Sequence, residues 1–205
     1  MQNVDITRKK KEENGKMSNE GTQQVVKKAN PGPLGLIGFG MTTVLLNLHN
    51  ADIITLSVVT IAMGFALGGL AQIIAGIMEF KYENTFGGTA FTAYGLFWWS
   101  LIFIWINPFG STEADEISMG FYLLLWGIFT IFMFIGTLKH NRASQVVFFT
   151  LSLLFVLLAA GDFTGIHEIT IVAGWVGIFC GLSAMYTSLA TVVNNEFGRT
   201  VFPLG

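Results

Sequence analysis

Charged side chains are scarce in this chain. Lys, Arg, Asp and Glu make up 12% of its 205 residues, and 52% are hydrophobic, whereas soluble domains carry about 25% charged residues. Seven of the 11 Lys and Arg lie in the first 28 residues. From Pro33 onward the chain consists mostly of long apolar blocks, so the composition predicts an integral membrane protein.

Other absences exclude several classes of function. The single cysteine, Cys180, rules out a disulfide within the chain and a cysteine metal site. A net charge of −2 gives no electrostatic support for a nucleic-acid partner. No GxSxG, HExxH or P-loop motif is present, and His49, His140 and His167 fall at helix ends or in loops. We therefore predict no enzyme, with no catalytic residues, metal ion or cofactor.

The first 29 residues differ from the remainder. They are polar and rich in lysine, and they lack the apolar core of a signal peptide. This composition predicts a disordered cytoplasmic tail. The expected organisation is a tail at 1–29 and one transmembrane domain at 30–205.

The apolar blocks are long enough to span a membrane several times. A bilayer core about 30 Å thick requires roughly 20 apolar residues in a helix. Six segments are predicted to span it: 33–48, 53–80, 89–106, 119–138, 144–160 and 169–193. Because the connections are short, an all-α compact bundle is expected in which sequential helices are neighbours.

The basic residues test this count of helices. With six spans and the N-terminus inside, the tail, the 81–88 and 139–143 loops and the C-terminus hold all 11 Lys and Arg. The outer loops hold none, which is the distribution expected when basic loops stay in the cytoplasm. The pattern predicts a multi-pass protein of the plasma membrane with both termini cytoplasmic.

The first span contains an unusual number of polar and small residues. Its sequence, NPGPLGLIGFGMTTVLLNLHN from Asn30 to Asn50, opens on two prolines and carries Thr42, Thr43 and Asn47 in its interior. A helix with so many hydrogen-bonding groups is more suited to lining a path than to anchoring a protein in lipid.

Other uncharged polar residues recur in later spans. We assign Gln72, Thr89 and Thr92 to the same candidate path. Hydroxyls, amides and helix ends can hold an anion without a buried countercharge, so this lining suits a small solute with one or two carboxyl groups. For any one of these residues, a hydrogen bond to the helix backbone is the alternative.

Glu79 is the acidic residue nearest to a membrane span. An intramembrane carboxylate indicates function by default, but Glu79 lies at the inner end of the second span. We therefore favour capping of the inner loop, or pairing with Lys81, Arg142 or Arg199, over a proton relay.

Aromatic residues form a stripe in the third span. Phe91, Tyr94 and Trp98 recur at helical spacing within NTFGGTAFTAYGLFWW. Such a stripe indicates packing or an interface belt, and an aromatic gate is the alternative. The Tyr94 hydroxyl would lie within the span and needs a hydrogen-bond partner.

These blocks together resemble a known family. NPGPLGLIGFGMTTVLLNLHN, AGIMEF, NTFGGTAFTAYGLFWW, YLLLWGIFTIFMFIGTLK, AGWVGIFCGLSAMY and NEFGRTVFPLG are similar, in order and spacing, to motifs of the acetate uptake transporters. That family includes the bacterial succinate–acetate permease and fungal acetate permeases. The resemblance runs from Asn30 to the C-terminus, and the departure in the opening NPAPLGL motif is Gly32 in place of alanine.

The resemblance implies a function and a site. It implies six transmembrane helices, a homohexameric ring and a path through each protomer for acetate, succinate or related short carboxylates. It also implies a midmembrane aromatic and apolar constriction, matched by Phe39 in GFG, Tyr94 in AYG and, less directly, Leu151 in FFTLSLLF. Independently, the distribution of basic residues places the segment with Asn30, Pro31 and Pro33 at the cytoplasmic edge, where it would form the inner mouth.

Two mechanisms and two other functions stay open. The solute could cross together with a proton, or as an anion through a channel. A membrane sensor of acetate is one alternative, although 28 polar residues make a small output domain. A transporter of another solute such as ammonium is the other, although ammonium paths use buried histidines and none lies in the predicted spans.

Overall fold

The computed structural model describes residues 29–108, 110 and 112–205, and these residues fold into helices joined by short connections. The predicted tail therefore lies outside the described residues, except for its final position. The helices and their bounds are α2 Gly32–Asn50, α3 Val58–Met63, η1 Gly64–Ala71, α4 Gln72–Lys81, α5 Thr85–Ile106, α6 Glu116–Thr137, α7 Arg142–Thr164 and α8 His167–Phe197.

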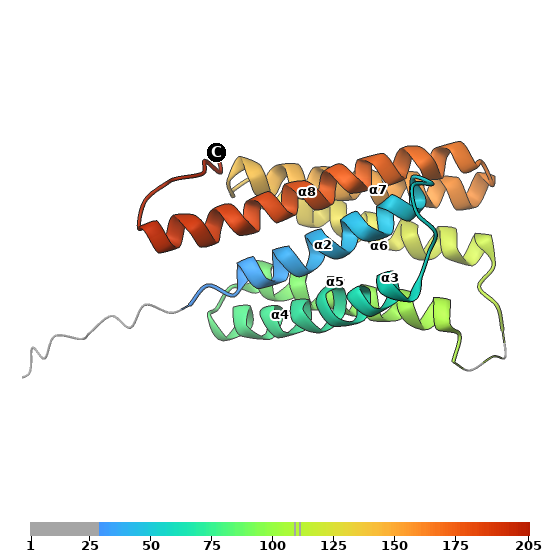
Figure 1. The fold of residues 1–205 in the computed structure, drawn as a ribbon, viewed down its shortest axis with the longest axis horizontal. Helices are drawn as coiled ribbons and strands as arrows, with labels where there is room; N and C mark the ends of the chain where they lie inside the picture. Colours follow the sequence, from blue (N-terminus) through green and yellow to red (C-terminus); the bar gives the residue numbers. More distant parts are fainter. Residues whose placement is uncertain (1–28, 109, 111) are drawn as a thin grey trace, which may run out of the picture. The chain divides into compact units, whose positions relative to one another are not determined.

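The helices form an antiparallel bundle (Figure 1). α3, η1 and α4 follow one another without a break as one rod over 58–81. This rod and α5, α6, α7 and α8 are five helices long and apolar enough to cross a membrane. The 19-residue α2 is not among the five by composition, because glycines and polar residues interrupt its apolar run.

Polar caps set the helix starts that hydropathy alone places too late. Asn84, Asp115 and Asn141 accept hydrogen bonds from the backbone N–H three residues ahead, at 3.1, 2.9 and 2.8 Å. Each cap satisfies a donor that the first turn leaves unpaired. The third, fourth and fifth helices thus begin at 85, 116 and 142, before the predicted 89, 119 and 144.

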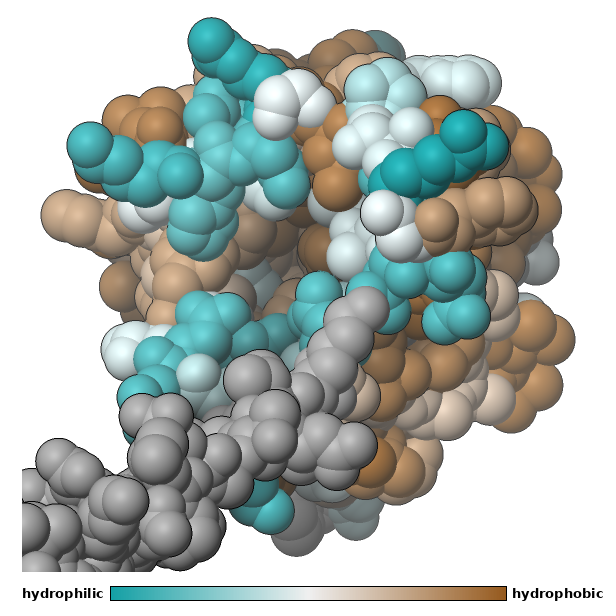
Figure 2. All heavy atoms as spheres, turned by 90° about the vertical axis from the view of Figure 1, so that its left-hand side faces the viewer, coloured by the Kyte–Doolittle hydropathy of each residue, from teal (hydrophilic) through white to brown (hydrophobic). Residues whose placement is uncertain are grey.

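The two ends of the bundle differ in charge. One end, here called the basic end, carries Lys81, Lys139, Arg142 and Arg199 near the ends of α4, α6, α7 and α8. Figure 2 shows hydrophilic side chains gathered at this end and hydrophobic ones along the sides of the bundle. The opposite, acidic end holds Asp52 in the α2–α3 connection and Glu113 and Asp115 in the α5–α6 connection. Asp162 near the end of α7 and Glu168 near the start of α8 also lie there.

Glycines allow α2 to lie directly against α8. A Cβ atom at Gly40 would come within 2.8 Å of the Gly181 carbonyl oxygen, and one at Gly181 within 2.7 Å of the Gly40 carbonyl oxygen. Gly177 provides the space that the Asn47 side chain fills. Helices in lipid associate through such close packing, so the small-residue stripe of α8 is a helix contact.

The second span contains a π-helix, a rare form often found at functional sites. It covers the eight residues of η1, and its glycines Gly64 and Gly68 pack against the indole of Trp98 on α5. Side chains use two of its carbonyls: Trp99 Nε1 donates to the Phe65 oxygen at 3.1 Å, and Gln72 Nε2 donates to the Gly68 oxygen at 2.7 Å.

Replacing Gly181 by alanine is expected to destabilise the protein. The added methyl group would press on the Gly40 carbonyl, and overpacking of this kind costs about 1–3 kcal/mol. Gly127→Ala is the matched control, because a Cβ atom there meets its nearest neighbour at 3.4 Å, an ordinary contact. Thermal unfolding of both variants in detergent tests this, and equal melting temperatures would contradict the proposed tight contact.

Candidate functional site

Two small cavities follow one another inside the bundle. The first, the basic-end chamber, has a volume of about 20 Å³ and is lined by Leu36, Phe39, Gln72, Ala90, Phe91, Tyr94, Val147, Phe148 and Leu151. The second, the acidic-end chamber, has about 30 Å³ and is lined by Phe39, Thr43, Leu46, Asn47, Tyr94, Phe97, Trp98, Leu151, Leu154, Phe155 and Leu158. Along α2 and α7, the first lining lies nearer the basic end and the second nearer the acidic end.

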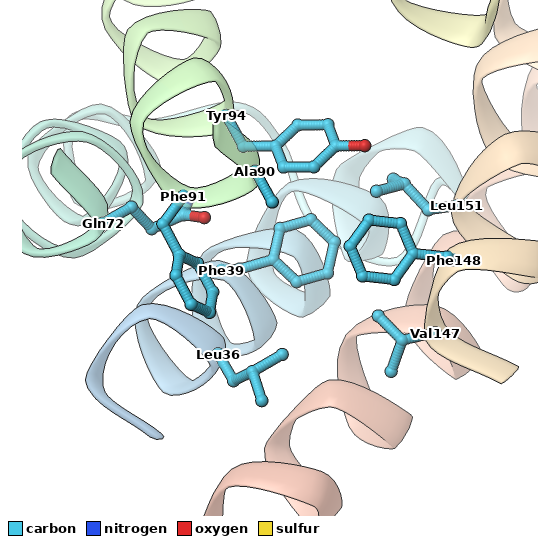
Figure 3. A pocket seen from close by; sticks show the side chains of 9 residues that line it. All are labelled: Leu36, Phe39, Gln72, Ala90, Phe91, Tyr94, Val147, Phe148 and Leu151. Carbon is cyan, nitrogen blue, oxygen red and sulfur yellow. The ribbon is translucent and has the colours of Figure 1, made fainter. Parts of the chain in front are cut away.

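Three residues belong to both chambers and form the wall between them. Phe39 of α2, Tyr94 of α5 and Leu151 of α7 have exposed fractions of 6%, 3% and 3%. The ring centroids of Phe39 and Tyr94 are 6.2 Å apart. Figure 3 shows the ring of Phe39 pointing toward that of Phe148, with Tyr94 and Leu151 beside them. The residues assigned to a constriction from the motifs thus meet in space.

The wall is held in place by α6. The Tyr94 hydroxyl donates to Thr130 Oγ1 at 3.0 Å, and Thr130 Oγ1 donates to the Trp126 carbonyl at 2.7 Å. Trp126 and Phe129 also lie against the Tyr94 ring, with centroids at 6.1 and 5.5 Å. The partner that the Tyr94 hydroxyl requires is therefore a threonine on a different helix.

The basic-end chamber has one polar residue besides Tyr94. The Gln72 side chain is fully buried, and its Nε2 donates to the Gly68 carbonyl at 2.7 Å. Its Oε1 has no hydrogen-bond partner. A buried polar group without a partner costs about 1–3 kcal/mol, but the surface of the chamber is apolar, so this oxygen does not face the cavity.

The acidic-end chamber has two residues with unpartnered donors. Thr43 Oγ1 and Trp98 Nε1 are buried and make no hydrogen bond in the described part of the chain. Besides Tyr94, the other polar residue of this chamber is Asn47, whose Nδ2 donates to the Thr43 carbonyl at 2.8 Å. Its Oδ1 accepts from Asn50 Nδ2 at 3.1 Å, so the Asn47 amide is already satisfied.

The other threonines assigned to the path lie in helix contacts. Thr42 Oγ1 donates to the Gly38 carbonyl at 2.7 Å, and its methyl group faces Gly68. Thr92 packs on Gly76, and its Oγ1 has no partner. Thr89 is half-buried. None of the three lines either chamber, so the structure brings Thr43, Asn47 and Gln72 to the cavities and leaves these three outside.

The residues assigned to the inner mouth stand at the start of α2. Asn30 is exposed, and Pro31 is the N-cap residue, whose carbonyl accepts from the Leu34 N–H at 3.0 Å. The Pro33 carbonyl accepts from Ser188 Oγ on α8 at 2.7 Å. This bond attaches the first turn of α2 to α8 at the basic end.

Glu79 closes the turn between α4 and α5. Its Oε2 accepts from Asn84 Nδ2 at 2.6 Å, and Asn84 Oδ1 in turn accepts from the Gly87 N–H at 3.1 Å. Within the described ranges Glu79 forms no salt bridge with a lysine or arginine. The Glu79 carboxylate is thus bonded to the residue that caps α5.

Sequence reasoning missed the contribution of α7 beyond Leu151. Val147 and Phe148 line the basic-end chamber, and the Phe148 and Tyr94 rings lie 6.2 Å apart. Phe148 precedes Leu151 by three residues and so shares its face of the helix. This spacing is a signal in principle, but the run around it is apolar on every side and hides which face is buried.

The chemistry of the site is uncharged. No Asp, Glu, Lys, Arg or His lines either chamber, and the described residues contain no cluster of His, Cys, Asp and Glu able to hold a metal ion. Room for one water requires about 10–15 Å³, so each chamber holds little more than a water molecule. A larger solute can pass only if wall side chains move.

The bond between Tyr94 and Thr130 generates a stability prediction. Thr130→Val leaves the buried Tyr94 hydroxyl without a partner, which costs about 1–3 kcal/mol. Adding Tyr94→Phe removes that hydroxyl and is expected to restore most of the loss. Chemical unfolding of the single and double variants in detergent measures both effects; additive losses would contradict a direct hydrogen bond.

Comparison with known proteins identifies the family to which this chain belongs. Residues 14–204 match the model of the GPR1/FUN34/yaaH family. The succinate-acetate/proton symporter SatP of Escherichia coli K12 is 54% identical over 181 residues, covering 87% of this chain and 96% of that protein. Ammonia transport outward protein 2 of Saccharomyces cerevisiae is 39% identical over 181 residues, covering 84% of this chain and 64% of that protein.

A solved structure agrees with these relatives. The bacterial acetate channel SatP matches with a TM-score of 0.86 and 54% identity, covering 87% of this chain and all of that one. The sequence match and the structural match both include every residue of the wall and of the two chambers. The resemblance read from the motifs is thereby confirmed: the chain is a multi-pass membrane protein that belongs to the GPR1/FUN34/yaaH family.

Proposed function

We propose that this protein transports acetate and related short carboxylates, succinate among them, along a path inside each protomer. The observation that carries the proposal is the pair of chambers on either side of Phe39, Tyr94 and Leu151. Each chamber is lined by at least one residue with a buried polar atom that lacks a partner, and neither lining contains a charged residue. Such a lining suits a small solute with one polar group and one apolar group, and it suits transport better than catalysis.

The same proposal includes the membrane topology. We assign α2 as a sixth span, since 19 residues rise about 28 Å, close to the thickness of a bilayer core of about 30 Å. Its polar and small residues face other helices, so low hydropathy does not argue against insertion. The four basic residues of the basic end support a cytoplasmic location for that end and for both termini. The membrane that we assign is the plasma membrane.

A homo-oligomer, with the hexamer favoured by the family resemblance, completes the proposal. Leu125 and Phe132 on α6 and Trp175 and Phe179 on α8 are 56–71% exposed. These faces are apolar and are covered in a membrane either by lipid or by neighbouring protomers. The path itself lies within one protomer, so transport does not require a residue from another.

The charge of the solute decides how it crosses the wall. A carboxyl group with a pKa of about 4 is almost entirely ionised at neutral pH, and protonating it at pH 7 costs about 4 kcal/mol at 1.36 kcal/mol for each pH unit. Moving an isolated carboxylate into an apolar site costs considerably more, up to tens of kcal/mol in the idealised limit. Passage through an uncharged wall therefore favours the protonated solute.

Ammonium is the second candidate solute, because a relative carries ammonia transport in its name. The chambers contain no histidine; His49 lies at the acidic end of α2, His140 follows α6 and His167 begins α8. Counterflow of labelled acetate against unlabelled carboxylates and ammonium separates the two candidates. Exchange by acetate and succinate without exchange by ammonium supports the carboxylate assignment, and the reverse result overturns it.

Phe39→Ala is expected to raise the flux of acetate and to admit longer carboxylates. The change removes the largest side chain that α2 contributes to the wall, and so widens the narrowest point between the chambers. Phe132→Ala is the control, because this ring is 71% exposed on the outer face of α6. Uptake of labelled acetate and butyrate into proteoliposomes measures both. Unchanged selectivity in the Phe39→Ala variant would show that Phe39 is not part of the constriction.

The topology predicts which loops are reachable from each side. Cys180 is fully buried, so a cysteine introduced at Lys139 or at Glu113 is labelled selectively. We expect an impermeant thiol reagent added outside intact cells to label Glu113→Cys and to leave Lys139→Cys unlabelled until the membrane is opened. Labelling of Lys139→Cys but not of Glu113→Cys in intact cells would show that the protein has the opposite orientation.

A further inference from the structure

An open groove lies on the outer surface of the bundle, between α6 and α7, which run side by side (Figure 1). It has a volume of about 230 Å³ and is lined by Ile131, Phe134, Phe149, Ser152, Leu153 and Val156. None of these residues lines either chamber, so the groove is separate from the path. It is several times larger than either chamber and therefore has room for a chain of carbon atoms.

The surface of this groove is apolar. Four of its lining side chains are 40–55% exposed, namely Ile131, Phe149, Leu153 and Val156. The polar lining residue, Ser152, is buried at the floor, and its hydroxyl donates to the Phe148 carbonyl at 2.8 Å. A polar ligand would lose its hydrogen bonds to water without replacement here. The occupant that the groove fits is therefore hydrocarbon.

The position of the groove along α7 matches the depth of lipid chains. Phe149 and Val156 follow Arg142, the first residue of α7, by 7 and 14 positions, which is roughly 10 and 21 Å along the helix axis. Each leaflet fills about half of a hydrocarbon core that is about 30 Å thick. Because α6 and α7 are both long and apolar enough to cross a membrane, the groove faces the acyl chains of the leaflet at the basic end.

The turn that joins α6 to α7 next to this groove is basic. Lys139 and Arg142 are exposed there, and the chain has no Asp or Glu between residues 117 and 161. Among the described residues neither side chain forms a salt bridge. Arg142 Nη1 donates to the uncharged Gln145 side chain, at 3.3 Å. The positive charge of the turn is therefore available to an anion at the membrane surface.

We propose that the groove and this turn together bind one anionic phospholipid. An acyl chain lies along the groove, and the phosphate contacts Lys139 and Arg142 at the adjoining membrane surface. Lysine and arginine form charge-assisted hydrogen bonds with phosphate oxygens, and basic residues next to a membrane helix attract anionic lipid. The site requires only that α6 and α7 cross the membrane, so it is independent of the solute that the protein carries.

The charge of the headgroup decides which lipid is preferred. Phosphatidylcholine has the same chains and phosphate as phosphatidylglycerol, but its quaternary ammonium group would lie next to Lys139 and Arg142. A lysine or arginine near the membrane surface strengthens the binding of an anionic lipid about fivefold. The two residues together are therefore expected to favour phosphatidylglycerol by about 25-fold.

Native mass spectrometry of the full-length protein in detergent measures this preference. Both lipids, with identical acyl chains, are titrated into the wild type and into Lys139→Gln/Arg142→Gln. The control, Lys81→Gln/Arg199→Gln, removes the same charge from exposed positions after α5 and α7 have been left intact, at the ends of α4 and α8. The lysine-rich first 28 residues are present in every variant, so their attraction for lipid is common to all.

Lys139→Gln/Arg142→Gln is expected to weaken the binding of phosphatidylglycerol about 25-fold and to leave phosphatidylcholine unchanged. The control is expected to stay near the wild-type value. Equal losses in the two variants, or no preference between the lipids in the wild type, overturn the proposal.

A photocrosslinker identifies what occupies the groove. Leu153 is replaced by p-benzoylphenylalanine, the protein is irradiated in liposomes of equal phosphatidylglycerol and phosphatidylcholine, and the mass of the adduct is determined. We expect phosphatidylglycerol to predominate. The same replacement at Leu182, which is 51% exposed on α8 and outside the groove, should show no preference between the lipids. An adduct with a second copy of this chain at Leu153, or equal capture of both lipids there, overturns the proposal.

Discussion

The direct backbone contact between α2 and α8 is the constraint on which the site depends. Gly40 and Gly181 have no side chains at the crossing, so the carbonyl oxygen of each lies only 2.7–2.8 Å from where a Cβ of the other would be. Lipid provides no hydrophobic force between helices, and close packing of this kind replaces it. With α2 held against α8, its other faces meet η1, α4 and α5. Phe39 lies beside Tyr94 there and shares the lining of both chambers with Tyr94 and Leu151.

The wall is fixed by aromatic contacts and one hydrogen bond rather than by charge. Tyr94 is held through Thr130 from α6, and its ring is packed among Trp126, Phe129 and Phe148. The only polar side-chain atom of the three wall residues, the Tyr94 hydroxyl, is thus satisfied. Among the lining residues, the unsatisfied polar atoms belong to Gln72, Thr43 and Trp98, which line the chambers on each side.

The sequence predicted the helical fold and the three wall residues but could not select among the polar side chains. Composition and hydropathy located the long helices, and motif resemblance selected Phe39, Tyr94 and Leu151. Thr42 and Thr43 illustrate the limit: they are adjacent and chemically identical, yet one faces a helix contact and the other a chamber. Successive residues of a helix are separated by a rotation of about 100°. Because the helix is apolar on most sides, its sequence does not show which of the two threonines faces the chamber.

A structure with a heavy-atom analogue bound tests the central claim most directly. Bromoacetate, soaked into crystals of a Cys180→Ala variant to avoid thiol alkylation, carries an atom that anomalous scattering locates without ambiguity. The account predicts bromine peaks within the two chambers, beside Phe39 and on either side of the wall. Peaks confined to the lipid-facing surface, or to the space between protein copies, would contradict a path through the protomer.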